Sequence, residues 1–164
     1  MELTHFDENG NARMVDVGAK DVTVRRARAR GTIRVSKEVM RAVLDRTVEK
    51  GDVLTVAQTA GILAAKKTAE LIPMCHPLPL THAAVTFETE EETGAIHVFC
   101  EAKTTGRTGV EMEALTGVQI ALLTIYDMCK AMDKRMVMED IHLVEKTGGK
   151  SGAAGGKGNH TACG

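Results

Sequence analysis

Apolar and polar residues alternate from residue 22 to residue 35, which predicts a half-buried β-strand. One face of this strand is apolar and carries Ala27, Ala29, Ile33 and Val35. The other face carries Arg26, Arg28, Arg30 and Arg34. Arg25 breaks the alternation, because its position places it on the apolar side. An arginine that is buried or faces a cleft needs an anionic partner, so Arg25 is a candidate anion-binding residue.

Helical periodicity replaces the alternation in the next two segments. Ser36 can cap a helix whose apolar stripe covers residues 39–48, and Lys50–Gly51 is expected to end it, since glycine suits a left-handed helix terminus. Asp52 can cap a second helix, which Ile72 and the following proline end. Its buried face is expected to consist of Val53, Val56, Ala57, Ala60, Leu63 and Ala64, small enough for another helix to approach closely.

The remaining pattern completes the predicted fold. Strands at 80–90 and 95–103 flank a polar turn, a helix follows at about 110–131, and a last strand covers 136–146. This order predicts an α+β fold, an antiparallel sheet with helices packed on one face, and a ferredoxin-like variant is the nearest named architecture. Residues 1–152 are expected to form one domain, and the glycine-rich residues 153–164 a flexible tail.

Composition excludes several classes of protein. The 164 residues contain no apolar run long enough to span a bilayer and no signal peptide, so a cytoplasmic protein is expected. A net charge of -1, no Trp, one Tyr and three Phe argue against a nucleic-acid-binding protein. The four cysteines lack the paired spacing of metal or redox sites, which predicts reduced thiols and no metal site.

Two segments carry candidate chemistry in the middle of the chain. His76 lies between two prolines in LIPMCHPLPL, on a stiff loop, although a lone histidine is more often structural. In TGRTGVEMEAL, Glu111 completes a capping-box pattern, and Glu113 would then be an ordinary acid of the first helical turn. The alternative is that both carboxylates accept N–H groups of a guanine-type ring, beside a glycine-rich phosphate cradle.

Two further segments carry charged groups near the C-terminal part of the chain. Asp127 and Lys130 share a helix face, either as an ordinary surface ion pair or, in an apolar setting, with pKa values displaced into a catalytic range. Lys146 precedes a glycine-rich stretch that could close over phosphates or simply fray. That stretch is no P-loop, because Val144 stands where the motif needs glycine.

Together, these segments resemble the MoaC family over about residues 3–152, through the strings MVDV, KGDV, AGI, LIPMCHPL, TGVEMEALT, LTIYDMCKA and KTGGKSG. The resemblance implies a lyase of molybdenum cofactor biosynthesis. Its substrate would be 3′,8-cyclo-7,8-dihydro-GTP, made by a radical SAM enzyme, and its products cyclic pyranopterin monophosphate and diphosphate. It also implies a homohexamer, assembled as a trimer of dimers.

The resemblance assigns roles to residues by position. Asp127 is the implied catalytic acid/base. Substrate contacts are implied at Met74, Cys75, His76, Met112 and Glu113. The other matching active-site positions are Lys50, Lys130, Arg25, Glu111 and Lys146. A lysine of lowered pKa could share the proton transfers, and the cations would neutralise phosphate charge. Assistance by Mg²⁺ is left open, since no ligand set for it is visible.

Two alternatives to this enzyme remain from the sequence: a nucleotide-binding regulator without catalytic activity and an RNA-binding ferredoxin-like module. The missing strand aromatics weaken the second. The enzyme hypothesis also requires a particular geometry. Glu113 and Asp127 on one helix would lie about 21 Å apart along its axis. Either a loop folds Glu113 back, or sites form at subunit interfaces.

Overall fold

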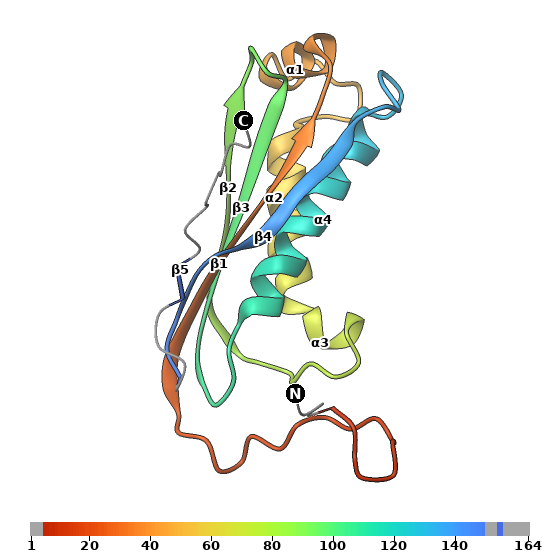
Figure 1. Ribbon diagram of the computed structural model, residues 1–164. Coiled ribbons are helices and arrows are strands. Elements are labelled where there is room, and N and C mark those ends of the chain that lie inside the picture. Colours follow the sequence, from red (N-terminus) through yellow and green to blue (C-terminus); the bar gives the residue numbers. More distant parts are fainter. Residues whose placement is uncertain (1–4, 150–153, 156–164) are drawn as a thin grey trace, which may run out of the picture.

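The computed structural model describes residues 5–149 and 154–155 of the chain. Their elements are β1 (Thr23–Arg34), α1 (Lys37–Leu44), α2 (Val53–Lys66), α3 (Thr68–Leu71), β2 (Leu80–Glu90), β3 (Ala95–Gly106), α4 (Glu111–Cys129), β4 (Val137–Thr147) and β5 (Ala154–Gly155). The strands form an antiparallel sheet in the order β2-β3-β1-β4-β5, and α2 and α4 cover one face of it (Figure 1). The order β2-β3-β1-β4 with helical crossovers is the ferredoxin-like arrangement, so the predicted fold is confirmed.

The alternation of β1 is confirmed by its burial. Ala27, Ala29 and Ile33 are at most 1% exposed and face the helix layer, where Val118, Leu122 and Ile125 of α4 are fully buried. Small residues let α2 and α4 approach each other closely, as predicted for the second helix. A β-carbon added to Gly61 of α2 would lie 2.8 Å from the carbonyl oxygen of Gly117 in α4. This contact of backbone with backbone fixes α2 against α4.

The predicted ends of the first two helices need correction. The first helix does not reach Lys50–Gly51. It ends at Leu44, because Arg46 turns to a positive φ of 56°, which an α-helix cannot continue through. The second helix stops at Lys66, and the separate α3 continues the chain to Leu71.

The buried face of α2 is also rotated from the predicted one. Val56 and Leu63 are 43% and 50% exposed, so their prediction as core residues was wrong within one chain. Val53, Ala57 and Ala64 are buried as predicted, and the close approach at Gly61 brings Ala65 inward in place of Val56 and Leu63. The predicted cap is confirmed, since Asp52 Oδ1 accepts the N–H of Thr55 at 3.1 Å.

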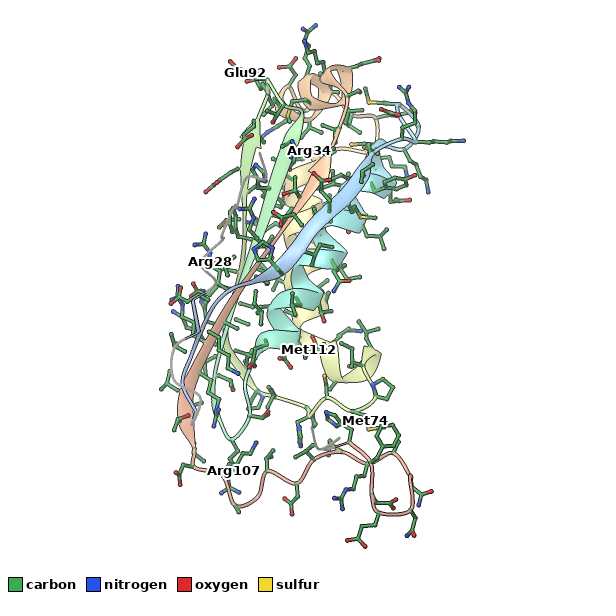
Figure 2. The ribbon with its side chains drawn as sticks, viewed as in Figure 1. Arg28, Arg34, Met74, Glu92, Arg107 and Met112 are labelled. Carbon is green, nitrogen blue, oxygen red and sulfur yellow. The ribbon has the colours of Figure 1, made fainter. Side chains whose placement is uncertain are left out.

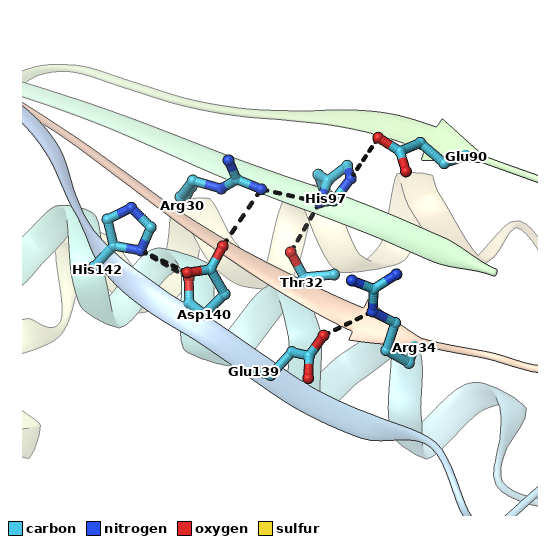
Figure 3. Close-up of polar contacts among 8 residues, drawn as sticks. All are labelled: Arg30, Thr32, Arg34, Glu90, His97, Glu139, Asp140 and His142. Atoms are coloured by element: carbon cyan, nitrogen blue, oxygen red, sulfur yellow. Dashed lines mark hydrogen bonds and ion pairs between the residues drawn. The ribbon is translucent and has the colours of Figure 1, made fainter. Parts of the chain in front are cut away.

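The other face of the sheet carries an extended polar network, part of which Figure 3 shows. The hydroxyl of Thr32 lies 2.8 Å and Arg30 Nη2 lies 3.2 Å from Nδ1 of His97, whose Nε2 is 3.2 Å from a Glu90 oxygen. A guanidinium can only donate, so Nδ1 is the acceptor and Nε2 holds the proton directed at Glu90. These bonds tie β1, β3 and β2 together in one register.

The predicted tail falls largely outside the described residues. Within the range 153–164, the structure describes the backbone of β5, where Ala154 pairs with Lys146 and Gly155 with Glu145 of β4. The other residues of that range, and the predicted domain end at 152, lie outside the described part. In the described part, no helix is long and apolar enough to cross a membrane.

Candidate active site

Two adjoining cavities of about 500 Å³ and 440 Å³ lie where α4 begins. Both are lined by Lys20, Thr108, Gly109 and Glu111, so they form one continuous groove. Figure 2 shows Met74, Arg107 and Met112 at this end of the molecule, beside the N-terminal segment, and Arg34 and Glu92 at the opposite end. The groove therefore combines the β1 start, the loop before α4, the loop before β2 and the N-terminal segment.

The larger cavity is rich in cations. It is lined by Lys20, Arg25, Arg107 and Lys146, against the two carboxylates of Asp21 and Glu111. The break in the alternation predicted that Arg25 lies on the inward side of its strand, and its side chain lines this cavity. Its Nε donates to the carbonyl oxygen of Gly106 at 2.9 Å. Four cations against two carboxylates make this cavity attractive to a polyanion such as a phosphate chain.

Glu111 does not cap α4, so the capping-box interpretation was wrong. The N-cap is Val110, and no side chain accepts a bond there. Glu111 instead forms an ion pair with Lys146 of β4 across the groove. Its carboxylate therefore lines the groove, although Glu111 is the first residue of α4.

The smaller cavity surrounds the buried carboxyl of Glu113, which is 4% exposed. Burial raises the pKa of Glu113, and the charge of Glu111 adds to that effect. The implied substrate contacts Met74, Cys75, His76 and Met112 all line the same cavity. The structure therefore brings together every implied substrate-binding residue at the start of α4.

Cys75 and His76 line the same cavity as Glu113. Burial raises the pKa of the Cys75 thiol, and the Glu113 charge contributes, so this thiol stays protonated at neutral pH. His76 Nε2 lies 2.7 Å from the carbonyl oxygen of Val15, to which it must donate. His76 therefore tethers the N-terminal segment while lining the cavity.

A second polar cluster lies at the other end of α4. Asp127 Oδ1 is 2.6 Å from Lys130 Nζ, and Oδ2 is 3.2 Å from Lys50 Nζ. The bonds from Lys130 and Lys50 lower the pKa of Asp127, and the bond to Asp127 raises the pKa of Lys130. The three side chains are about half exposed. The expected apolar setting and the lowered pKa are therefore both wrong for Lys130 in the isolated chain.

The structure does not bring the two clusters together within one chain. Helix α4 is continuous from Glu111 to Cys129, with Glu113 in its first turn and Asp127 in its last. These two residues are separated by about 21 Å along the axis. The alternative in which a loop folds Glu113 back toward Asp127 is wrong, because the helix begins before Glu113.

Sequence reasoning missed Lys20 and Arg107 as groove residues. Arg107 stands inside the TGRTG string, so it could have been identified as a candidate from the sequence. Its bond of 2.8 Å from Nη1 to the carbonyl oxygen of Gly18 could not have been predicted, because the two residues are far apart in sequence. Lys20 carries no local signal, because only the path of the N-terminal segment brings it to the groove. Among the residues that the structure describes, no group of three or more His, Cys, Asp or Glu could hold a metal ion.

Comparison with known proteins gives concordant results. A family model described as the MoaC family matches residues 14–149. The chain is 59% identical to the cyclic pyranopterin monophosphate synthase of Heliobacterium modesticaldum over 150 residues, which cover 92% of this chain and 94% of that protein. Proteins of the same name from Desulfitobacterium hafniense and Listeria monocytogenes are 59% and 58% identical, and cover 93% and 92% of this chain and 93% and 94% of their own length.

Proposed function

The chain belongs to the MoaC family, and we propose that it is a lyase of molybdenum cofactor biosynthesis. It converts 3′,8-cyclo-7,8-dihydro-GTP into cyclic pyranopterin monophosphate and releases diphosphate. The observation that carries this proposal is the groove at the start of α4, where four cations lie beside three carboxylates. A triphosphate and a guanine-derived ring present the complementary groups.

The cation-rich cavity suits the phosphate chemistry. An oxygen of the substrate attacks the α-phosphorus, a new P–O bond closes the cyclic phosphate, and the bond to the β-phosphate breaks to release diphosphate. Arg25 and Lys146 lie where they can neutralise the charge that develops on the leaving group. Lys20 and Arg107 extend the same positive lining.

The smaller cavity suits the ring. Carboxylates accept N–H groups of the kind that a guanine-derived ring presents, and Glu111 and Glu113 line one side of this cavity. Met74 and Met112 supply an apolar, adaptable surface for its flat face. The raised pKa of Glu113 also permits this residue to hold a proton when the ring excludes water.

Proton transfers are assigned to the cluster of Asp127, Lys50 and Lys130. Asp127 is the anionic member of this cluster and is assigned to accept a proton, whereas Lys130, held protonated by its bond to Asp127, is assigned to donate one. Substitution distinguishes the roles of the two lysines. Lys50→Ala or Lys130→Ala should lower turnover if that lysine is a proton donor, whereas a loss confined to substrate affinity would make it a phosphate anchor.

We propose that each site is shared between two subunits. A two-fold axis near the middle of α4 would lay the helices of two chains antiparallel, so that Glu113 of one chain approaches Asp127 of the other. The exposed stripe of α4 supports this packing, since it includes Met112 and Leu123, which are 39% and 49% exposed. Val56 and Leu63 of α2 add exposed apolar surface that a second copy could cover.

The proposed shared site and reaction also imply an oligomeric state and a cellular location. The protein would form a homohexamer, a trimer of such dimers, in the cytoplasm, where a radical SAM enzyme supplies the substrate. Among the described residues, no group of three or more His, Cys, Asp or Glu could hold a metal ion. The proposal assigns no reaction step to Mg²⁺, which binds through one or two carboxylates together with substrate phosphates in many enzymes.

The test is to incubate the protein with 3′,8-cyclo-7,8-dihydro-GTP and to measure diphosphate, together with a fluorescent pterin after oxidation. Asp127→Asn is the matched control, since it is nearly isosteric and removes only the acid-base function. The wild-type chain should form both products, and the variant should bind substrate but lose most turnover. Binding without products in the wild type would favour a regulator, and wild-type turnover in Asp127→Asn would refute its role.

A further inference from the structure

Two consecutive glycines at the end of β4 lie directly against Arg25. Gly148 and Gly149 have φ angles of +92° and +82°, a conformation that residues with a side chain rarely adopt. A β-carbon on Gly149 would lie 2.4 Å from Nη1 of Arg25. A β-carbon on Gly148 would lie 2.3 Å from the carbonyl oxygen of Val24. Position 148 therefore requires glycine for two independent reasons, its φ and the β1 backbone, whereas at position 149 a side chain is strained by φ and would force the end of Arg25 to move.

The same guanidinium is held from its other side by backbone. Arg25 Nε donates to the carbonyl of Gly106 at 2.9 Å, and Nη2 lies 3.4 Å from the carbonyl of Asp21. Gly149 and Arg25 line the larger cavity together with Lys146. The guanidinium is thus packed between bare backbone at Gly149 and the carbonyl of Gly106, which sets its direction in the groove.

We propose that Gly149 is a positioning residue that holds Arg25 in the orientation in which it binds the phosphates of the substrate, with Gly148 supporting the turn that brings it there. The proposal rests on the phosphate-binding role of Arg25 in the proposed function. The two glycines act differently. A side chain at position 149 meets the free end of Arg25 and would push the guanidinium aside, whereas one at position 148 meets the backbone of β1 and would disturb the strand pairing.

A plain turn would not explain Gly149. Gly10 also has a positive φ of +80°, but a β-carbon there would meet nothing within 4 Å, so its glycine serves the backbone conformation alone. Gly149 combines the same kind of φ with a close contact to a groove cation. Gly10→Ala is therefore a matched control, because it introduces similar backbone strain far from Arg25.

The experiment measures the binding of inorganic diphosphate by titration calorimetry to the wild type and to the variants Gly149→Ala, Gly10→Ala and Arg25→Ala. Loss of one well-placed guanidinium contact should weaken binding about tenfold. Gly149→Ala and Arg25→Ala should both show this loss, and Gly10→Ala should bind like the wild type. The double variant Gly149→Ala with Arg25→Ala should bind no more weakly than Arg25→Ala, since both changes remove the same contact.

A crystal structure of Gly149→Ala separates this proposal from the proposed function. The expected structure keeps the β1–β4 pairing and loses the bond from Arg25 Nε to Gly106. An unmoved Arg25, or a further loss of binding when Gly149→Ala is added to Arg25→Ala, would overturn the positioning role. If Arg25 is displaced but Arg25→Ala binds diphosphate like the wild type, the phosphate role in the proposed function fails, and the positioning role in binding fails with it.

Discussion

Mixing two inactive variants tests whether the active site is shared between subunits. Asp127→Asn removes the acid-base group at the end of α4, and Glu113→Ala removes the buried carboxyl at its start. Each variant alone should be inactive, because every site lacks one of the two groups. The separation of about 21 Å along the helix means that the two groups of one chain cannot serve one small substrate.

The expected recovery follows from counting chains. If subunits from an equal mixture reassociate at random, about half of the sites receive an intact Asp127, and about half of those also receive an intact Glu113 from the neighbour. Activity should therefore rise to about one quarter of the wild-type level, far above that of either variant alone. A site formed within one chain would recover nothing, since no chain carries both groups.

The assay is diphosphate release after subunit exchange, with exchange confirmed by mass spectrometry of differently tagged chains. The matched control mixes Asp127→Asn with Lys130→Ala. These two residues are 2.6 Å apart in one chain, so no site in that mixture can receive both intact groups. Confirmed exchange with activity unchanged from the separate variants would refute the shared site. Equal recovery in the control mixture would refute it as well.

Two other predictions concern the charged groups of the sheet. In steady-state kinetics, Arg25→Ala should raise the KM for substrate more than Arg28→Ala does, because Arg25 faces the groove and Arg28 faces the opposite side of the sheet. Equal, small effects of the two substitutions on KM would contradict the assignment of Arg25 to the groove. The ion pair with Arg26 lowers the pKa of Glu101 from 4.5 to about 2, so its stabilisation is complete above pH 4.5 and is lost as the pH falls toward 2. In urea denaturation at fixed protomer concentration, Glu101→Gln should lower the free energy of unfolding by at most about 3 kcal/mol at pH 7. The difference between the variant and the wild type should be smaller at pH 3. A difference that does not change with pH would refute the ion-pair argument.

Local sequence determined most of the elements. The alternation in β1, the Asp52 cap and the turn between β2 and β3 each depend on neighbours within a few residues, which a sequence displays directly. The inward position of Arg25 was predicted in the same way. The motifs that resemble the MoaC family also named the residues that gather at the start of α4.

Other features depended on contacts between segments that are far apart in sequence. The capping-box pattern at Glu111 is satisfied locally, but Lys146 of β4 takes the carboxylate as its partner. The exposure of Val56 follows from the approach of α2 to α4 at Gly61, and Lys20 reaches the groove only through the path of the N-terminal segment. Periodicity shows which residues share one face of a helix or strand, but the packing of the elements determines what that face contacts.

The main feature that only the tertiary structure shows is the separation of the polar cluster at Glu113 from the polar cluster at Asp127. The sequence by itself identified Glu113 and Asp127 as functional candidates and placed them on one predicted helix. It left open whether a loop could fold one back toward the other. The continuous α4, packed against both α2 and the sheet, removes that freedom, because a helix with its backbone bonds made cannot bend to join its own ends.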